Sequence, residues 1–226
     1  MSDKQIILYV ARHGTTAMNE QNKFRGDSNP SLDAKGYRDA NELAFYFEPI
    51  ELSFIVSSSK LRAATTANII SLQKKLKQSV NDGCRFDLTP VLNDLLHPWN
   101  VGDFGGKEKT PERIKELQGY ISNPDKQVPG GTSLNEFRGR VRPLFKEAIE
   151  ASNNAGVPGL LVVHSSVIHE LGECVSGNHE AGHVRPGGVA AVYIHNGRLG
   201  VEPIFKPDDK SKTQNILGVG RSGLSS

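Results

Sequence analysis

The stretch Ile6-Ile7-Leu8-Tyr9-Val10-Ala11, followed directly by Arg12-His13-Gly14-Thr15-Thr16, decides the fold of this chain. A continuous apolar run of this composition is typical of a strand that is buried on both faces of a parallel sheet. A second buried run, Gly159–Val163, is followed by His164-Ser165-Ser166. Ligands of open parallel sheets bind beyond the carboxyl ends of the strands, so the sequence predicts a site that contains both histidines.

Helical and extended patterns alternate along the rest of the chain. Helices are expected at residues 37–47, 61–77 and 167–175, after Thr110-Pro111-Glu112, and after the capping box Ser133-Leu134-Asn135-Glu136. Strands are expected at residues 54–56, 84–92, 189–194 and 199–205, the last two forming a hairpin through Asn196-Gly197. This alternation predicts an α/β fold, a three-layer sandwich with a mainly parallel central sheet and helices on both faces. Pro143 leaves the continuity of its helix open.

The length of 226 residues fits one domain, which we place at residues 1–205, followed by a polar tail at residues 206–226. The net charge is only +2, so no basic field predicts binding to nucleic acid or to an anionic membrane. Neither a secretory signal pattern nor an apolar run of membrane-spanning length is found, and the two cysteines, Cys84 and Cys174, lack Cys-x-x-Cys spacing. We therefore expect a cytoplasmic protein with reduced thiols. A homo-oligomer is compatible with the sequence, which carries no signal for one.

Basic residues near the two strand ends indicate the kind of ligand. Arg12 adjoins His13, and Arg62 follows another short strand. Guanidinium groups bind phosphate oxygens as a fork and keep their charge, and Gly14 would let backbone amides approach an anion. Two arginines and two histidines around one crevice repel one another unless an anion lies between them. The sequence therefore predicts a site for a small phosphorylated substrate.

Four separated motifs then appear in a recognisable order. They are Arg12-His13-Gly14-Thr15-Thr16, extended by Asn19, Phe24-Arg25-Gly26, Leu32 and Gly36; Ser58-x-x-Leu61-Arg62-Ala63-x-x-Thr66-Ala67; Pro129-Gly130-Gly131-Thr132-Ser133; and Val163-His164-Ser165. With these motifs the chain resembles the histidine phosphatase superfamily, which includes cofactor-dependent phosphoglycerate mutases and many small phosphatases. The resemblance covers residues 6–169, and the joint order of the motifs is far more specific than any one of them.

The resemblance implies a mechanism without metal or cofactor. His13 attacks phosphorus and forms a phosphohistidine, while Arg12, Arg62 and His164 hold the equatorial oxygens. Asn19, Arg25 and the backbone at Gly26 are implied to complete the phosphate and substrate contacts. A carboxylic acid protonates the leaving oxygen and then activates the water that releases phosphate.

The general acid is the least regular part of the resemblance. The superfamily usually carries a glutamate in a Leu-x-Glu run before a Gly-x-x-x-Gly turn, whereas this chain has Leu92-Asn93-Asp94 and a late turn at residues 102–106. Asp94 is the preferred acid, and Asp103 and His97 are the alternatives. Trp99 is expected either in the core or, with His97, on the wall that faces the leaving group.

Two departures bear on the reaction. The mutase-like Glu-Arg-His-Tyr run is absent, and Gly131-Thr132-Ser133 replaces the more usual Gly-Glu-Ser. Both favour a phosphomonoesterase acting on a small phosphorylated metabolite. A phosphoglycerate mutase-type phosphotransferase and a non-catalytic phosphate-binding module are the alternatives.

One further motif, His179-Glu180-Ala181-Gly182-His183, matches the His-Glu-x-x-His signature of zinc peptidases. That signature requires a stable helix and a third ligand. Gly177, Gly182 and Pro186 oppose a helix, and no convincing third ligand follows. We therefore predict no metal, and we expect a loop beside the crevice from which His183 and Arg185 touch the substrate.

Overall fold

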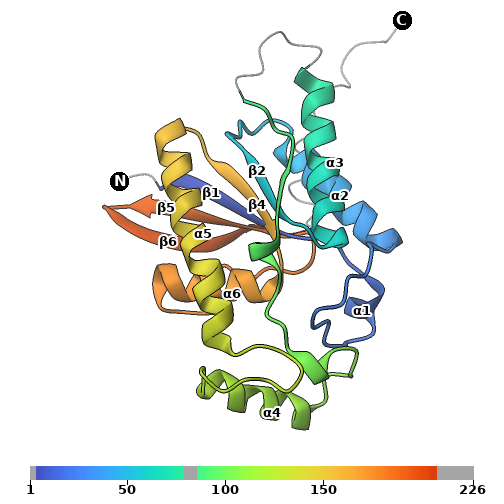
Figure 1. The fold of residues 1–226 in the computed structure, drawn as a ribbon. Coiled ribbons are helices and arrows are strands. Elements are labelled where there is room, and N and C mark those ends of the chain that lie inside the picture. Colours follow the sequence, from blue (N-terminus) through green and yellow to red (C-terminus); the bar gives the residue numbers. More distant parts are fainter. Residues whose placement is uncertain (1–3, 79–85, 208–226) are drawn as a thin grey trace, which may run out of the picture.

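The computed structural model describes residues 4–78 and 86–207, in which six strands form one sheet in the order β3-β2-β4-β1-β5-β6 (Figure 1). The strands are β1 (Gln5–Arg12), β2 (Ile55–Ser58), β3 (Val91–Asn93), β4 (Gly159–Val163), β5 (Val189–His195) and β6 (Arg198–Phe205). The first four are parallel to one another, whereas β5 runs antiparallel to β1 and β6 antiparallel to β5. The predicted mainly parallel sheet is confirmed.

The register of the two central strands brings their carboxyl ends together. Leu8 is opposite Gly159 and Arg12 is opposite Val163, so residues that follow β1 and β4 leave the sheet at one edge. The amide of His13 donates to the carbonyl of Val163 at 3.1 Å, which extends this pairing by one residue. His13 and His164 are thus neighbours because two buried strands pair in register.

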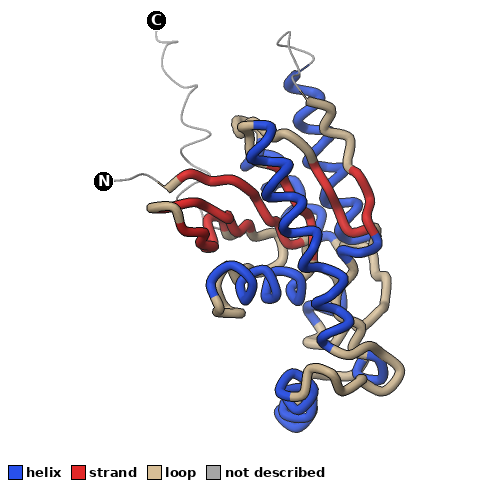
Figure 2. The backbone as a smooth tube through the Cα atoms, turned by 60° about the vertical axis from the view of Figure 1, so that its left-hand side comes forward, coloured by secondary structure: helices blue, strands red, loops and turns tan. Residues whose placement is uncertain are grey.

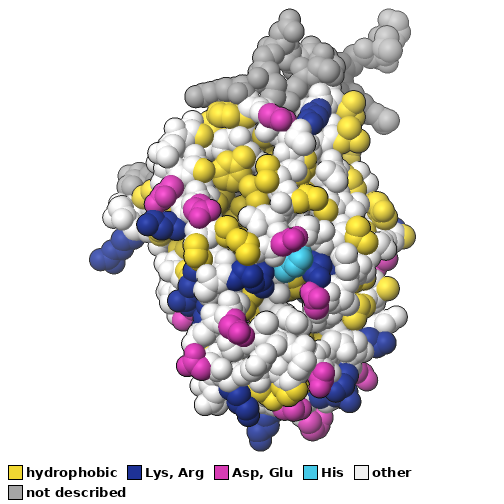
Figure 3. Space-filling model, in the orientation of Figure 1, with side chains coloured by type: hydrophobic (Ala, Val, Ile, Leu, Met, Phe, Trp, Pro, Cys, Tyr) yellow, Lys and Arg dark blue, Asp and Glu magenta, His cyan; other side chains and the backbone are white. Residues whose placement is uncertain are grey.

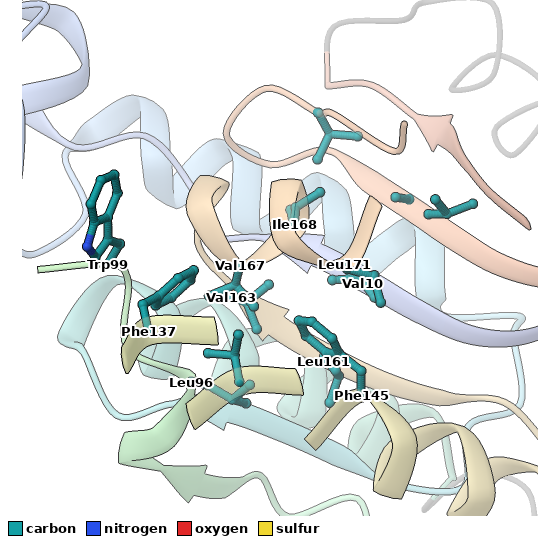
Figure 4. Packing of buried hydrophobic residues seen from close by; sticks show 14 of the residues in the cluster. Val10, Leu96, Trp99, Phe137, Phe145, Leu161, Val163, Val167, Ile168 and Leu171 are labelled. Carbon is teal, nitrogen blue, oxygen red and sulfur yellow. The ribbon is translucent and has the colours of Figure 1, made fainter. Parts of the chain in front are cut away.

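Helices cover both faces of the sheet (Figures 1 and 2). The helices are α1 (Ala17–Glu20), α2 (Ala34–Phe47), α3 (Leu61–Gln78), α4 (Pro111–Ser122), α5 (Leu134–Ala155) and α6 (Ser165–Ser176). Val10 and Leu161 face the apolar sides of α5 and α6, as Figure 4 shows. Tyr9 and Leu160, one residue away on each strand, face α2 and α3. This alternation explains why both strands read as unbroken apolar runs.

Helix α4 and the two short 3₁₀ helices, η1 (Asp94–Leu96) and η2 (Gly102–Phe104), lie in the long connection between β3 and α5. In Figures 1 and 2, α4 lies at the end of the molecule away from the sheet. Its side chains Leu117 and Ile121 line a cavity beside the strand ends. This connection therefore forms part of the surroundings of the site, not part of the sandwich.

Local sequence signals located most element boundaries. Ser133 and Glu136 form the predicted capping box of α5, and Thr110 caps α4 with Pro111 in the first turn. Asn196 and Gly197 both have positive φ, of 51° and 72°, as the tight turn of the hairpin requires. Helix α5 continues through Pro143, because buried side chains on both sides of it keep the helix on the sheet.

Two predictions concern segments only partly described. The strand expected at residues 84–92 is observed as β3 at Val91–Asn93, and residues 84–85 lie outside the described residues. The tail expected from Lys206 lies outside them beyond residue 207.

The described surface carries mixed charge. On the face shown in Figure 3, basic, acidic and apolar side chains are interspersed. None of the helices in the described part of the chain is both long enough and apolar enough to cross a membrane. Cys174 is a free, exposed thiol, and Cys84 lies outside the described residues.

Candidate active site

Two buried histidines form the centre of the site. The rings of His13 and His164 are 5.2 Å apart between centroids and inclined by 57°. His13 is fully buried and His164 is 1% exposed. Each follows the strand predicted from the sequence, so the structure brings this pair together as expected.

The hydrogen bonds of His13 determine which ring nitrogen is available. Nδ1 lies 2.7 Å from the carbonyl oxygen of Gly14, which can only accept, so Nδ1 carries the hydrogen. Nε2 therefore holds a lone pair, and it accepts from Nε of Arg62 at 3.2 Å. The main chain that carries the ring is held by Gly187, whose amide donates to the carbonyls of Arg12 and His13, each at 3.1 Å. A neutral, oriented imidazole with its Nε2 lone pair facing the arginines is a nucleophile in position.

Three guanidinium groups converge on this pair, and the charge of Asp27 offsets only part of what burial and Arg25 do to the pKa of Arg62. Arg12 donates from Nη1 to the carbonyl of Val184 at 2.9 Å, and Arg62 from Nη1 to that of Ser28 at 3.1 Å. Among the described residues, Arg12, Arg62 and Arg25 form no ion pair. Buried charges are normally paired, so the arrangement calls for an anion from outside the chain.

Unused polar atoms point to the same conclusion. Nε of Arg12, Nη2 of Arg62 and Nδ1 of His164 are buried and have no hydrogen-bond partner. Most buried polar groups in proteins are paired, and an unpaired one costs about 1–3 kcal/mol. Three unpaired atoms from three elements of one site suit a ligand with several acceptor oxygens, and a phosphoryl group has them.

Burial and mutual repulsion shift the pKa values of these groups. Burial, then the charges of Arg62, Arg25 and Arg12, lowers the pKa of His13 well below its usual value. Burial and the charge of Arg62 do the same to the pKa of His164. Burial and the charges of Arg25 and Arg62 lower the pKa of Arg12 to about 9. Burial and the charge of Arg25, opposed by Asp27, lower the pKa of Arg62 to about 9. At neutral pH the imidazoles are therefore neutral while the guanidinium groups stay charged.

We expect both imidazoles to remain neutral at pH 6.0 in the folded protein. In protein unfolded by urea, the same two residues should titrate at about pH 6.5. The folded state then binds fewer protons, so the free energy of unfolding falls as pH falls below about 6.5 and is fully recovered above it. Nitrogen-15 NMR of the imidazoles, with urea unfolding at pH 5.5 and 7.5, measures both effects. Adding inorganic phosphate should move both pKa values upward. A His13 resonance typical of imidazolium at pH 6.5 without phosphate would contradict this assignment.

The loop that follows His13 is held by close backbone packing. A Cβ on Gly14 would lie 2.3 Å from the carbonyl oxygen of Gly36, and one on Gly36 would lie 2.0 Å from that of Thr15. Thr15 donates from N and Oγ1 to the buried carboxylate of Asp39, at 2.9 and 2.6 Å. The amide of Gly14 donates to Oγ1 of Thr66 at 3.2 Å. Gly14 thus serves to dock the loop on α2, and its own N–H is engaged within the protein.

The remaining residues predicted to bind phosphate lie in the segment after α1. Arg25 is half-buried, and its charge contributes to the lowered pKa of His13, His164, Arg12 and Arg62. Gly26 has a φ of +51°, and a Cβ there would lie 3.2 Å from the Cα of Gly105. Oδ1 of Asn19 accepts from N and Oγ1 of Thr16 as the cap of α1, so only the Nδ2 group of Asn19 can donate to a ligand.

The acid candidates separate into two places. Oγ of Ser59 donates to Oδ1 of Asp94 and lies 2.7 Å from Nε2 of His97, which is 3.3 Å from the same carboxylate. The neighbouring residue, Ser58, places its Oγ 2.8 Å from Nε2 of His164. Asp94 and His97 are therefore connected to the histidine pair through two consecutive serines. Asp103 instead donates its amide to Pro129 and packs against the turn at residues 129–131.

The Asp94 carboxyl is open to a ligand, since 81% of its side chain is exposed. Burial is the main cause that lowers the pKa of His97, and the charge of Lys60 lowers it further. His97 is therefore neutral at pH 7. The structure places Asp94 and His97 in one hydrogen-bonded group with Ser59.

A cavity of about 600 Å³ opens beside the histidine pair. His164, Arg25 and Gly26 belong to its wall, which makes it continuous with the phosphate-binding groups. Much of the lining is apolar: Phe24, Trp99, Leu117, Ile121, Leu134 and Phe137. Trp99 is 7% exposed and donates from Nε1 to the carbonyl of Thr132 at 3.0 Å, so it belongs to both the core and the cavity wall.

Two further residues of the site escaped the sequence analysis. Ser58 ends β2 and contacts His164, so the strand-end argument would have found it had the strand been extended beyond residue 56. Lys109 lines the cavity, and the charges of Arg25 and Arg12 contribute to its lowered pKa after burial. Nothing local marks Lys109, because the fold of the β3–α5 connection brings it to the site.

Comparison with known proteins places this chain in one superfamily of phosphatases and mutases. The sequence profile of the histidine phosphatase superfamily (branch 1) matches residues 8–196. A 2,3-bisphosphoglycerate-dependent phosphoglycerate mutase of Parvibaculum lavamentivorans is 29% identical over 170 residues, 73% of this chain and 77% of the relative. The uncharacterized phosphatase PhoE of Bacillus subtilis is also 29% identical over 170 residues, 74% of this chain and 76% of the relative.

A solved structure gives the same fold. The crystal structure of a phosphoglycerate mutase from Bacillus anthracis superposes with a TM-score of 0.69 at 23% identity, covering 91% of this chain and 94% of that one. The names of the relatives include both mutases and phosphatases, so similarity alone leaves the choice between these reactions open.

Proposed function

Since the chain belongs to the histidine phosphatase superfamily, we propose that it is a phosphomonoesterase that forms a phosphohistidine at His13 and needs no metal ion for that chemistry. The carrying observation is the set of unpaired buried donors on Arg12, Arg62 and His164 around the neutral His13 ring. The two guanidinium groups supply positive charge, and the neutral His164 ring supplies a hydrogen-bond donor, to the phosphoryl group during its transfer.

In the first step, the lone pair of His13 Nε2 forms a bond to phosphorus while the bond from phosphorus to the leaving oxygen breaks. Arg62 Nε, now 3.2 Å from His13 Nε2, turns its hydrogen to an equatorial oxygen. Asp94 gives its proton to the leaving oxygen and becomes a carboxylate. That carboxylate then takes a proton from water, whose oxygen attacks phosphorus and displaces neutral His13.

The cavity supports hydrolysis of a substrate larger than glycerate phosphate. A volume of about 600 Å³ with a largely apolar lining suits a leaving group that has apolar parts. Gly131-Thr132-Ser133 stands where Gly-Glu-Ser is more usual, and the mutase-like Glu-Arg-His-Tyr run is absent. We propose a small phosphorylated metabolite with an amphipathic leaving group. The mutase named among the relatives makes phosphoryl transfer between glycerate positions the second candidate.

We expect the purified protein to hydrolyse an aryl phosphate in the presence of EDTA, because arginines supply the positive charge at the phosphate. With 3-phosphoglycerate and catalytic bisphosphoglycerate, release of inorganic phosphate should exceed formation of 2-phosphoglycerate. Phosphate release and product ratios measured by phosphorus-31 NMR test both points. Isomerisation faster than hydrolysis would favour the second candidate, and loss of all activity with EDTA, restored by a divalent ion, would overturn the metal-independent mechanism.

Asp94→Asn is expected to slow hydrolysis of an alkyl phosphate by about 10²–10⁴-fold, the usual contribution of a general acid. An aryl phosphate has a better leaving group, so its hydrolysis should slow much less. Steady-state kcat on the two substrates measures the difference, with Asp103→Asn as the matched control. If Asp94→Asn behaved alike on both substrates while His97→Asn showed the selective loss, His97 would take the role of the acid.

A further inference from the structure

Three side chains outside the phosphate site form a compact group. His169 lies on α6, while Glu180 and His183 lie in the turn region that leads to β5. One ligand atom from each lies within 4.8 Å of those from the other two. The segment from His179 to His183 consists of turns, as the sequence predicted, so the spacing of a zinc-peptidase helix does not create this group.

Hydrogen bonds orient His169 as a metal ligand would be oriented. Its Nδ1 lies 2.7 Å from the carbonyl oxygen of His179 and therefore donates a hydrogen. Nε2 of the neutral ring then carries a lone pair. Metal-bound histidines in proteins usually donate their other ring nitrogen to such an acceptor, which fixes the tautomer and the ring orientation.

The spacing of the two imidazoles suits one small ion. Nδ1 of His183 lies 3.2 Å from Nε2 of His169, a hydrogen bond between two stacked rings that a bound ion would replace after a small turn of the rings. In a tetrahedral zinc site each nitrogen lies about 2.0–2.1 Å from the ion. Two such nitrogens are then about 3.3–3.4 Å from each other. Glu180 supplies the third atom from an exposed side chain, whose Oε1 now lies 3.7 Å from Nδ1 of His169 and 3.3 Å from Nε2 of His179 and would turn toward the ion on binding.

We propose that His169, Glu180 and His183 bind one divalent transition-metal ion on the wall of the substrate cavity. Two imidazole nitrogens and one carboxylate oxygen favour Zn²⁺ over Mg²⁺ or Ca²⁺, which prefer oxygen ligands. Three protein ligands leave a coordination position for water or for an oxygen atom of a ligand in the cavity. Sequence analysis missed this site because His169 precedes the His-Glu-x-x-His motif and comes from a different element.

The site is adjacent to the phosphate-binding groups without being part of them. His169 and Glu180 line the same cavity as His164 and Arg25. His183 is followed by Val184, whose carbonyl holds Nη1 of Arg12 at 2.9 Å. A bound ion would therefore fix both the cavity wall and the segment that positions Arg12. The phosphoryl group would still be transferred to His13 and not to the ion.

Metal-free protein titrated with ZnCl₂ in a calorimeter should bind one Zn²⁺ per chain. Co²⁺ should give visible absorption bands of a four- or five-coordinate ion, and excess Zn²⁺ should abolish them. His169→Ala, Glu180→Gln and His183→Ala should each weaken Zn²⁺ binding by at least about 100-fold, since even groups that only orient a ligand contribute 10–100-fold. Circular dichroism and thermal melting without metal establish that each variant is folded.

His179→Ala is the matched control. It keeps the carbonyl group that orients His169 and removes a neighbouring imidazole, so Zn²⁺ should bind within about threefold of wild type, far from the loss expected of a ligand. The proposal is overturned if the wild type shows no saturable Zn²⁺ binding, if His169→Ala and His183→Ala bind like the wild type, or if His179→Ala loses binding as fully as they do. The readout is binding, so it stands apart from the test of hydrolysis.

Discussion

Replacement of His13 by alanine is expected to reduce hydrolysis of an aryl phosphate by at least about 10⁴-fold, in the range found when a catalytic nucleophile is removed. The physical reason is the loss of the Nε2 lone pair that the Gly14 carbonyl and Arg62 orient. The arginines remain, so the variant should still bind inorganic phosphate. Steady-state kinetics and phosphate binding by calorimetry together separate the lost chemistry from the retained binding.

A covalent intermediate provides a second measurement of the same change. Wild-type protein quenched in alkali during turnover of a phosphorus-32 substrate should carry acid-labile label, and His13→Ala should carry none. His195→Ala, a substitution on β5 away from the site, serves as the control. Hydrolysis surviving in His13→Ala at a tenth of the wild-type rate would remove His13 from the mechanism.

Substitution Arg62→Lys is expected to lower kcat by about 10²–10³-fold, the loss found when one donor to a transition-state oxyanion is removed. Arg62 is fully buried, donates from Nε to His13 and from Nη1 to the Ser28 carbonyl, and keeps Nη2 without a partner in the protein, so Nη2 can donate to a phosphate oxygen. A lysine keeps the charge but has one nitrogen, which cannot replace this planar fork. The effect should also appear as weaker binding of inorganic phosphate.

The control for this substitution is Arg198→Lys, an exposed position on β6. Its kcat should stay within a factor of about two, as expected of surface changes. Thermal melting of both variants distinguishes misfolding from lost catalysis. An Arg62→Lys variant with near wild-type kcat would show that charge alone suffices and that the fork geometry contributes nothing.

The parts of the site predicted from the sequence are those fixed by strand ends. Residues 6–11 and Gly159–Val163 read as buried strands, and parallel pairing then places His13 beside His164 whatever the rest of the chain does. Arg62 followed the same rule from the first turn after β2. The layers of the sandwich could be predicted for a related reason, since α2, α5 and α6 each carry one apolar face.

The parts that sequence analysis left open, such as the choice between Asp94 and His97, or missed, such as Lys109, depend on segments without periodicity. The connection between β3 and α5 contains two 3₁₀ helices and turns, so no pattern indicates where Asp94, His97 or Lys109 will lie. The grouping of His169 with His183 joins a helix to a loop, and only the tertiary fold brings them together. The boundary of β2 was placed too early because its last residues, Ser57 and Ser58, are polar yet fully buried.

The unpaired guanidinium groups also bear on how this chain can evolve. Arg12, Arg62 and Arg25 repel one another, and well-packed apolar residues of similar volume are often as stabilising as buried ionic groups, or more so. In a descendant that no longer bound phosphate, selection for stability would thus not oppose replacement of these arginines, and the replacement could increase the free energy of unfolding. A chain that retains all three arginines carries a cost in stability that a bound anion relieves.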